Sequence, residues 1–214
     1  TASSCTAVGR DALGSNTTGA NNSGFGDQAL VNNTTGDRNA AFGNGSMGAN
    51  TTGQYNTGFG QNTLALNTTA SNNTAVGKSA LEQNTTGTDN VAVGKEALNA
   101  NTTANNNTAI GVTALLANTE GYSNTAVGQS SLKANTTGNN NVAVGRTALF
   151  ANTTGSNNVA VGINALDAQT TANYNTAVGN GALGANTTGD RNVALGYEAM
   201  FTNTVGDRSV AIGM

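Results

Sequence analysis

The sequence predicts an all-β protein, a parallel β-solenoid (a β-roll) of about twelve 17-residue coils. Glycine recurs every 17 residues in the 214-residue chain without a slip, from Gly9 through Gly128 to Gly213. The residues between these glycines repeat as well, with the consensus N-[T/V]-A-V-G-x-x-A-L-x-A-N-T-T-G-x-x. A short period without insertions is the signature of one structural unit stacked on copies of itself. We therefore expect residues 1–214 to form a single continuous solenoid domain.

The composition favours a thin core in which stacked backbones supply most of the order. Aromatic residues make up 4% of the chain and charged residues 9%, and proline and histidine are absent. Disordered chains also lack large side chains, but they are usually charged and do not place Val and Leu at fixed intervals. The net charge is −3, and Lys and Arg do not cluster, so we expect no nucleic-acid partner. No apolar stretch approaches the roughly 18 residues of a membrane span, so we expect no membrane insertion.

The best strand candidate in each coil is the three-residue segment before the fixed glycine, as in Thr125-Ala126-Val127. The third column of this segment contains only Val, Ile, Leu and Phe, and the middle column contains only Ala and Gly. Successive side chains of a strand point to opposite faces, so either the Val column or the Ala column lies inside the coil. Both arrangements leave an apolar ridge on the outside, which a soluble monomer rarely exposes.

We take the middle column as the outer ridge and expect another copy of the chain to cover it. Its uniformly small side chains would allow two backbones to approach closely, and we expect a homotrimer. The predicted oligomer ridge consists of Ala75, Ala92, Ala109, Ala126, Ala143, Ala160, Ala177 and Ala194.

A second short strand is expected through Ala148-Leu149, with the Leu column in the core. Met47 and Met200 replace Leu in this column, which is the volume-conserving exchange expected inside a core.

Two asparagine columns, which begin at Asn16 and Asn22, are expected to form ladders of stacked side-chain amides. The Thr-Thr-Gly after the first column is expected to form the corner of the coil. Asn-Thr-Thr is also a glycosylation sequon, which we interpret as a structural corner instead.

The two glycine columns differ in their tolerance of other residues. The fixed column never varies, which indicates a turn that needs a positive φ or has no room for a Cβ. The column of Gly138 admits Ala70, Ala104 and Ala172, so Gly128→Ala is expected to be more damaging than Gly138→Ala. The predicted turn glycines are Gly77, Gly94, Gly111, Gly128, Gly145, Gly162, Gly179 and Gly196.

Residues that carry catalytic or metal chemistry are scarce. The chain has no histidine and one cysteine, Cys5, which leaves little for a nucleophile–base pair or a zinc site. Acidic residues such as Asp11 and Asp27 occupy variable columns, where a solvated charge is expected rather than a catalytic pair. We predict no enzymatic activity, no cofactor and no metal site.

The segments Asn90-Val-Ala-Val-Gly94 and Ser209-Val-Ala-Ile-Gly213 resemble the Asn-Ser-Val-Ala-Ile-Gly-type repeat of trimeric autotransporter adhesin heads. Those heads are trimers of left-handed parallel β-rolls on bacterial surfaces. The fuller coil, residues 124–138, resembles repeats of bacteriophage tail-fibre and related bacterial surface-fibre proteins. The resemblance implies an extracellular location, on a bacterial surface or a virion fibre, and a role in attachment.

The function expected from these observations is a non-catalytic shaft or head segment of an extracellular fibre involved in adhesion. Its partners would be further copies of the chain and a cell-surface receptor or glycan. Two alternatives stay open: a solenoid that binds glycan or ice directly through a repeated Asn/Thr face, and a subunit of an end-to-end polymerising filament. Neither end carries an evident cap, so we expect a piece of a longer fibre or end-to-end stacking.

Overall fold

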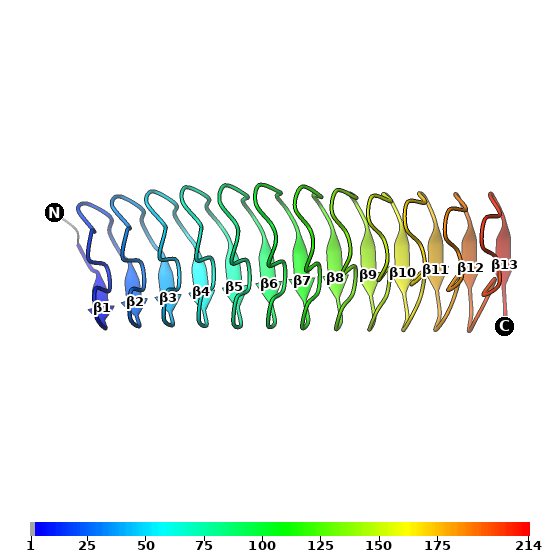
Figure 1. Ribbon diagram of the computed structural model, residues 1–214, viewed down its shortest axis with the longest axis horizontal. Helices are drawn as coiled ribbons and strands as arrows, with labels where there is room; N and C mark the ends of the chain where they lie inside the picture. The colour runs from blue at the N-terminus through cyan, green and yellow to red at the C-terminus, as the bar shows by residue number, and fades with distance from the viewer. Residues whose placement is uncertain (1–2) are drawn as a thin grey trace. The chain divides into compact units, whose positions relative to one another are not determined.

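The computed structural model describes residues 3–214, which form a parallel β-solenoid of about twelve coils of about 17 residues (Figure 1). The predicted fold class is confirmed. The chain divides into two units, Thr1–Asn106 and Asn107–Met214, and each is described by itself. In both units every coil follows the same path, from a short strand through a turn segment to a corner and on to the next strand (Figure 1).

Each strand has three residues and is the segment that the sequence predicted. The strands of the first unit are β1 (Thr6–Val8), β2 (Ser23–Phe25), β3 (Ala40–Phe42), β4 (Thr57–Phe59), β5 (Thr74–Val76) and β6 (Val91–Val93). Those of the second unit are β7 (Thr108–Ile110), β8 (Thr125–Val127), β9 (Val142–Val144), β10 (Val159–Val161), β11 (Thr176–Val178), β12 (Val193–Leu195) and β13 (Val210–Ile212).

Within each unit the strands pair in parallel and in sequence order, and each residue lies opposite its equivalent in the next coil. Ala126 of β8, for example, pairs with Ala143 of β9, and Val127 pairs with Val144. This register turns every column of the sequence into a ladder of equivalent side chains.

The second strand expected at Ala148-Leu149 is wrong, because this part of the coil consists of tight turns. The Ala148 N–H donates to the Gly145 carbonyl at 3.3 Å, and the Asn152 N–H donates to the Leu149 carbonyl at 3.2 Å. Leu149 has a φ of 51°, in the left-handed region, which a bulky residue rarely adopts and a strand cannot contain. This conformation buries its side chain completely, so the core position predicted for the Leu column is confirmed.

The core of each coil combines apolar and amide side chains. In the coil that contains β8, Ala126, Leu132 and Asn135 are fully buried, and Asn124 is 1% exposed. No helix within residues 3–214 has the length and apolar character needed to cross a membrane.

Candidate functional site

The alanine column of the strands lies inside the coil, so the predicted oligomer ridge is wrong as a surface feature. All eight of its members are 0% exposed within a single chain. The reason is space, because a Cβ built on Gly24 of this column would lie 3.4 Å from Leu13 Cγ, which leaves room for little more than a methyl group. The column's restriction to Ala and Gly was the signal, since it marks a limit on size that a solvent-facing position would not impose. The buried members are Ala75, Ala92, Ala109, Ala126, Ala143, Ala160, Ala177 and Ala194.

The first and third residues of the strands point outward instead. We call these two columns the outer sheet face; in β8 they are Thr125 and Val127, and in β9 Val142 and Val144. They contain no charged residue in any of the thirteen strands. Their exposed members include Ile110 at 40% and Val144 at 36%. The apolar ridge expected from the sequence therefore exists, but it is built from Val, Ile, Leu, Phe and Thr, with Ser23 and Ala40.

In the first unit the outer sheet face carries three stacked rings. The Phe25 and Phe42 ring centroids lie 4.7 Å apart with an interplanar angle of 6°, and those of Phe42 and Phe59 lie 5.5 Å apart. Phe59 is 58% exposed. Such a stack is one more apolar surface that water solvates poorly.

The first asparagine column forms the predicted amide ladder, and the ladder is buried. Asn135 Nδ2 donates to Asn118 Oδ1 at 2.8 Å, and Asn152 Nδ2 donates to Asn135 Oδ1 at 2.9 Å. Each amide also donates to the carbonyl three residues later, as Asn135 does to Gly138 at 2.9 Å. Buried polar groups cost stability unless they are hydrogen-bonded, and this ladder satisfies them through the stack itself.

The second asparagine column forms a ladder of a different kind. The backbone N–H of Asn141 donates to Asn124 Oδ1 at 3.0 Å, and Asn124 Nδ2 donates to the Gly138 carbonyl at 2.8 Å. Each side chain thus links its own strand to the strand of the next coil and to a corner. The sequence predicted the ladder but not these backbone partners.

The corner leaves a single polar column exposed. Thr136 is half-buried, and its Oγ1 donates to the Thr153 carbonyl of the next coil at 3.1 Å. Thr137 is exposed, whereas Asn135 and Asn152 are 0% exposed. The buried Asn columns therefore cannot belong to an Asn/Thr binding face, and the sequon asparagines Asn84 and Asn152 are inaccessible in the folded coil.

The fixed glycine column has the backbone conformation that the sequence predicted. Its predicted members, from Gly77 to Gly196, have φ between 118° and 138°. A Cβ built on Gly128 would also lie 2.6 Å from the carbonyl carbon of Gly145 in the next coil. Gly138 does not have a positive φ, although a Cβ there would clash with the Gly155 carbonyl oxygen and with Asn135 Oδ1.

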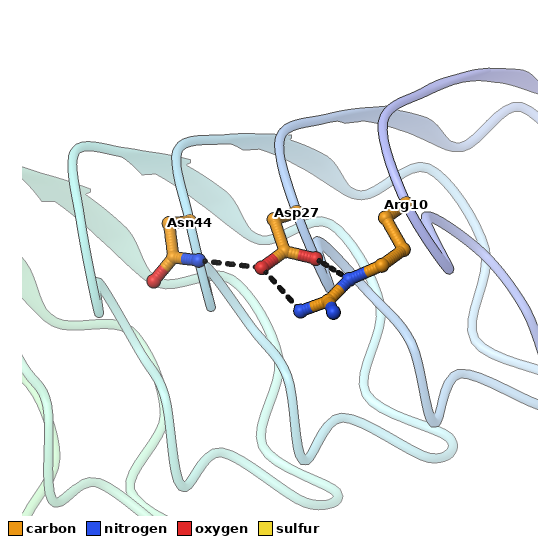
Figure 2. Close-up of polar contacts among 3 residues, drawn as sticks. All are labelled: Arg10, Asp27 and Asn44. Carbon is orange, nitrogen blue, oxygen red and sulfur yellow. Dashed lines mark hydrogen bonds and ion pairs between the residues drawn. The ribbon is translucent and has the colours of Figure 1, made fainter.

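Of the acidic residues singled out in the sequence, Asp27 contacts side chains of both neighbouring coils. Arg10 Nε donates to Asp27 Oδ1 at 2.8 Å, and Asn44 Nδ2 donates to Asp27 Oδ2 at 3.1 Å, which joins three successive coils (Figure 2). The hydrogen bond from Arg10 holds the pKa of the Asp27 carboxyl below its usual value. This is an ion pair in solvent, since the Arg10 side chain is 71% exposed.

Within residues 3–214, no three His, Cys, Asp or Glu side chains gather closely enough to hold a metal ion. Comparison with protein-family models, with curated proteins and with solved structures gives no match for this chain. The chain is therefore described by its architecture, as a parallel β-solenoid repeat protein.

Proposed function

We propose that this chain is a non-catalytic structural segment, a shaft or head, of an extracellular fibre that serves attachment. Three copies associate through the outer sheet face, and the fibre belongs to a bacterial surface or a virion. The observation that carries the proposal is the outer sheet face itself, which is apolar or hydroxylated and has no charge in any strand. The resemblance of the strand segments to trimeric adhesin heads supports the number of copies and the location.

The extent of this face fits an association surface. Strands stack at about 4.8 Å, so the six or seven strands of one unit extend the face by about 30 Å. A three-residue strand is about 10 Å long, so the face of one unit covers about 300 Å². The largest apolar patch on a typical monomer covers about 300–600 Å² and often serves binding, so the face of one unit is large enough to contribute to an interface.

The interior supports a structural role. Buried amide ladders link coil to coil, and the charged groups lie in columns that differ from coil to coil. A scaffold needs such uniform stacking, whereas a catalytic site needs particular side chains in one place.

The test is the absolute solution mass by light scattering on a size-exclusion column. The wild-type chain is expected at three times its 21.1 kDa mass. Val127→Lys places an ammonium on the outer sheet face and should shift the mass to that of one chain with the fold retained. Thr137→Lys, at the exposed corner of the same coil, is the control and should leave the mass unchanged.

Other masses would contradict parts of the proposal. A wild-type monomer would refute association through the outer sheet face. Larger species that grow with concentration would favour the end-to-end filament over the trimer. An unchanged mass for folded Val127→Lys would place the interface elsewhere.

A further inference from the structure

The second unit contains a hollow of about 450 Å³ beside the coil that follows β11. It exists because this coil has glycine in two columns of its turn segment, at Gly181 and Gly184. The preceding coil fills the same columns with Asn164 and Asp167. The two missing side chains open a gap between the flanking coils, which lie two strand spacings, or about 10 Å, apart.

One wall of the hollow is the ring of Phe201 in the following coil. A Cβ built on Gly184 would lie 2.9 Å from Phe201 Cε2 and 3.1 Å from Cδ2, so the ring packs directly against the glycine backbone. The ring is nevertheless 46% exposed. The ring therefore lies over the glycine backbone, and its exposed part forms one side of the hollow.

The remaining groups around the hollow are carboxylates and amides. Asp167 and Asn164 come from one side, Glu198 from the other, and Asn180 from the glycine coil itself. No lysine or arginine lines the hollow. Asp167 is half-buried, and this burial raises the pKa of its carboxyl.

This combination fits one class of ligand. Small-molecule sites have volumes of about 300–1,000 Å³, with apolar walls and a few polar groups that fix orientation. A pyranose ring has an apolar face of C–H groups and a rim of hydroxyls, which suit the ring of Phe201 and the acceptors around it. Acidic sugars and phosphates do not suit the hollow, because it contains carboxylates and no cation.

The same two columns provide an internal comparison in the first unit. Gly45 and Gly48 also leave them without side chains. There the flanking coils supply Val31 and Ala65 in the second of these columns, with neither a carboxylate nor a ring. A pair of glycines alone does not create the arrangement seen in the second unit.

We propose that the hollow bounded by Asp167, Glu198 and Phe201 binds a neutral hexose unit of a glycan. The site lies on a single chain, and so it does not depend on the fibre proposal or on the number of copies. In a fibre, it would place a glycan contact on the side of the solenoid.

The test is a titration of the full ¹⁵N-labelled chain with the methyl glycosides of glucose, galactose and mannose, followed by backbone amide shifts. Saturable shifts are expected at Gly181 and Gly184 for at least one glycoside, with a dissociation constant on the order of 1 mM for so small a ligand. Gly184→Leu should weaken binding at least about tenfold, because the side chain fills the hollow. Leu116 occupies the same column in another coil, but at position 184 a leucine must shift the Phe201 ring, so circular dichroism is used to check that the variant is folded.

Two matched variants serve as controls. Phe201→Ala should also abolish the shifts, whereas Phe150→Ala, in the same column three coils earlier without the glycine gap, should not. Gly48→Leu should leave binding unchanged. The proposal is overturned if no glycoside gives saturable shifts at 50 mM, which is about fifty times the expected constant. It is equally overturned if folded Gly184→Leu binds as wild type does, or if glucuronate binds more tightly than the neutral glycosides.

Discussion

Gln169 is the one residue that interrupts the first asparagine ladder, and replacing it with Asn should stabilise the protein. Its extra methylene displaces the amide from the ladder. Gln169 Nε2 lies 3.4 Å from Asn152 Oδ1, and Asn186 Nδ2 lies 3.5 Å from Gln169 Oε1. The regular step from Asn152 to Asn135 measures 2.9 Å. The two bonds at Gln169 are thus at the outer limit of hydrogen-bond geometry.

The magnitude follows from the bonds gained and lost. A buried hydrogen bond contributes about 0.5–1.5 kcal/mol net, so restoring two weakened bonds gives about 1–2 kcal/mol at most. Asn175 would lose its 2.8 Å bond to Gln169 Oε1 but keep its 2.7 Å bond to the Gly189 carbonyl. The lost bond offsets part of this gain, so we expect Gln169→Asn to raise the free energy of unfolding by about 0.5 kcal/mol. The reverse change in a regular step, Asn135→Gln, should lower it by about the same amount.

Ala172, which stands at the corner of this coil in place of glycine, does not make a glutamine necessary at position 169. Asn67 precedes Ala70 with the same spacing, and its ladder bond to Asn50 is 2.9 Å. Asn is therefore compatible with an alanine at the corner.

The assay is urea unfolding followed by circular dichroism, with all variants compared at one protein concentration. Stacked repeats can unfold in more than one step, so the transition midpoints and slopes are compared together. For a chain of this size, 1 kcal/mol corresponds to about 2–4 °C in Tm. If Gln169→Asn is neutral or destabilising while Asn135→Gln is harmless, the ladder does not contribute as argued.

The remaining predictions concern the glycine columns, the interior alanine and one ion pair. Gly128→Ala should lower the free energy of unfolding by about 1–3 kcal/mol more than Gly138→Ala, because only the first adds a strained positive φ; equal urea midpoints would contradict this. Ala126→Lys puts a charge into the core and should remove the strand signal from the circular dichroism spectrum at 25 °C. A native spectrum would show that the alanine column lies on the surface. The hydrogen bond from Arg10 lowers the pKa of Asp27 in the folded state. The ion pair therefore stabilises the fold above the unfolded pKa of Asp27, which is about 4, and this contribution is lost as the pH falls through the folded pKa. The difference in Tm between wild type and Asp27→Asn should therefore shrink from pH 5 to pH 2, and a constant difference would argue against the ion pair.

The period of the sequence was sufficient to predict the solenoid and the strand before each fixed glycine. Thr125–Val127 is a strand because its short β-branched pattern ends at a glycine that cannot continue it. The Leu column and the asparagine ladders were predictable too, since each combines a fixed residue type with a plausible interior role.

Alternation alone could not show which face of the strand lies inside the coil. Alternation shows that Thr125 and Val127 share a face, but the choice of Ala126 for the interior depends on how much volume Leu132 and the amides occupy. The left-handed conformation of Leu132, with a φ of 50°, was equally hidden, because it is normally associated with Gly and Asn. The hollow at Gly184 had a visible signal, two departures from the consensus in one coil, but its walls depend on coils 17 residues away.

The central claim is that the asparagine ladders lie inside the coil and hold the stack together. It is tested most directly by hydrogen–deuterium exchange of the side-chain amides, measured by NMR on the unmodified chain. The amides of Asn135 and Asn141, which are 0% exposed and hydrogen-bonded, should exchange orders of magnitude more slowly than those of the exposed Asn140 and Asn157. Fast exchange of all four at one rate would contradict the claim.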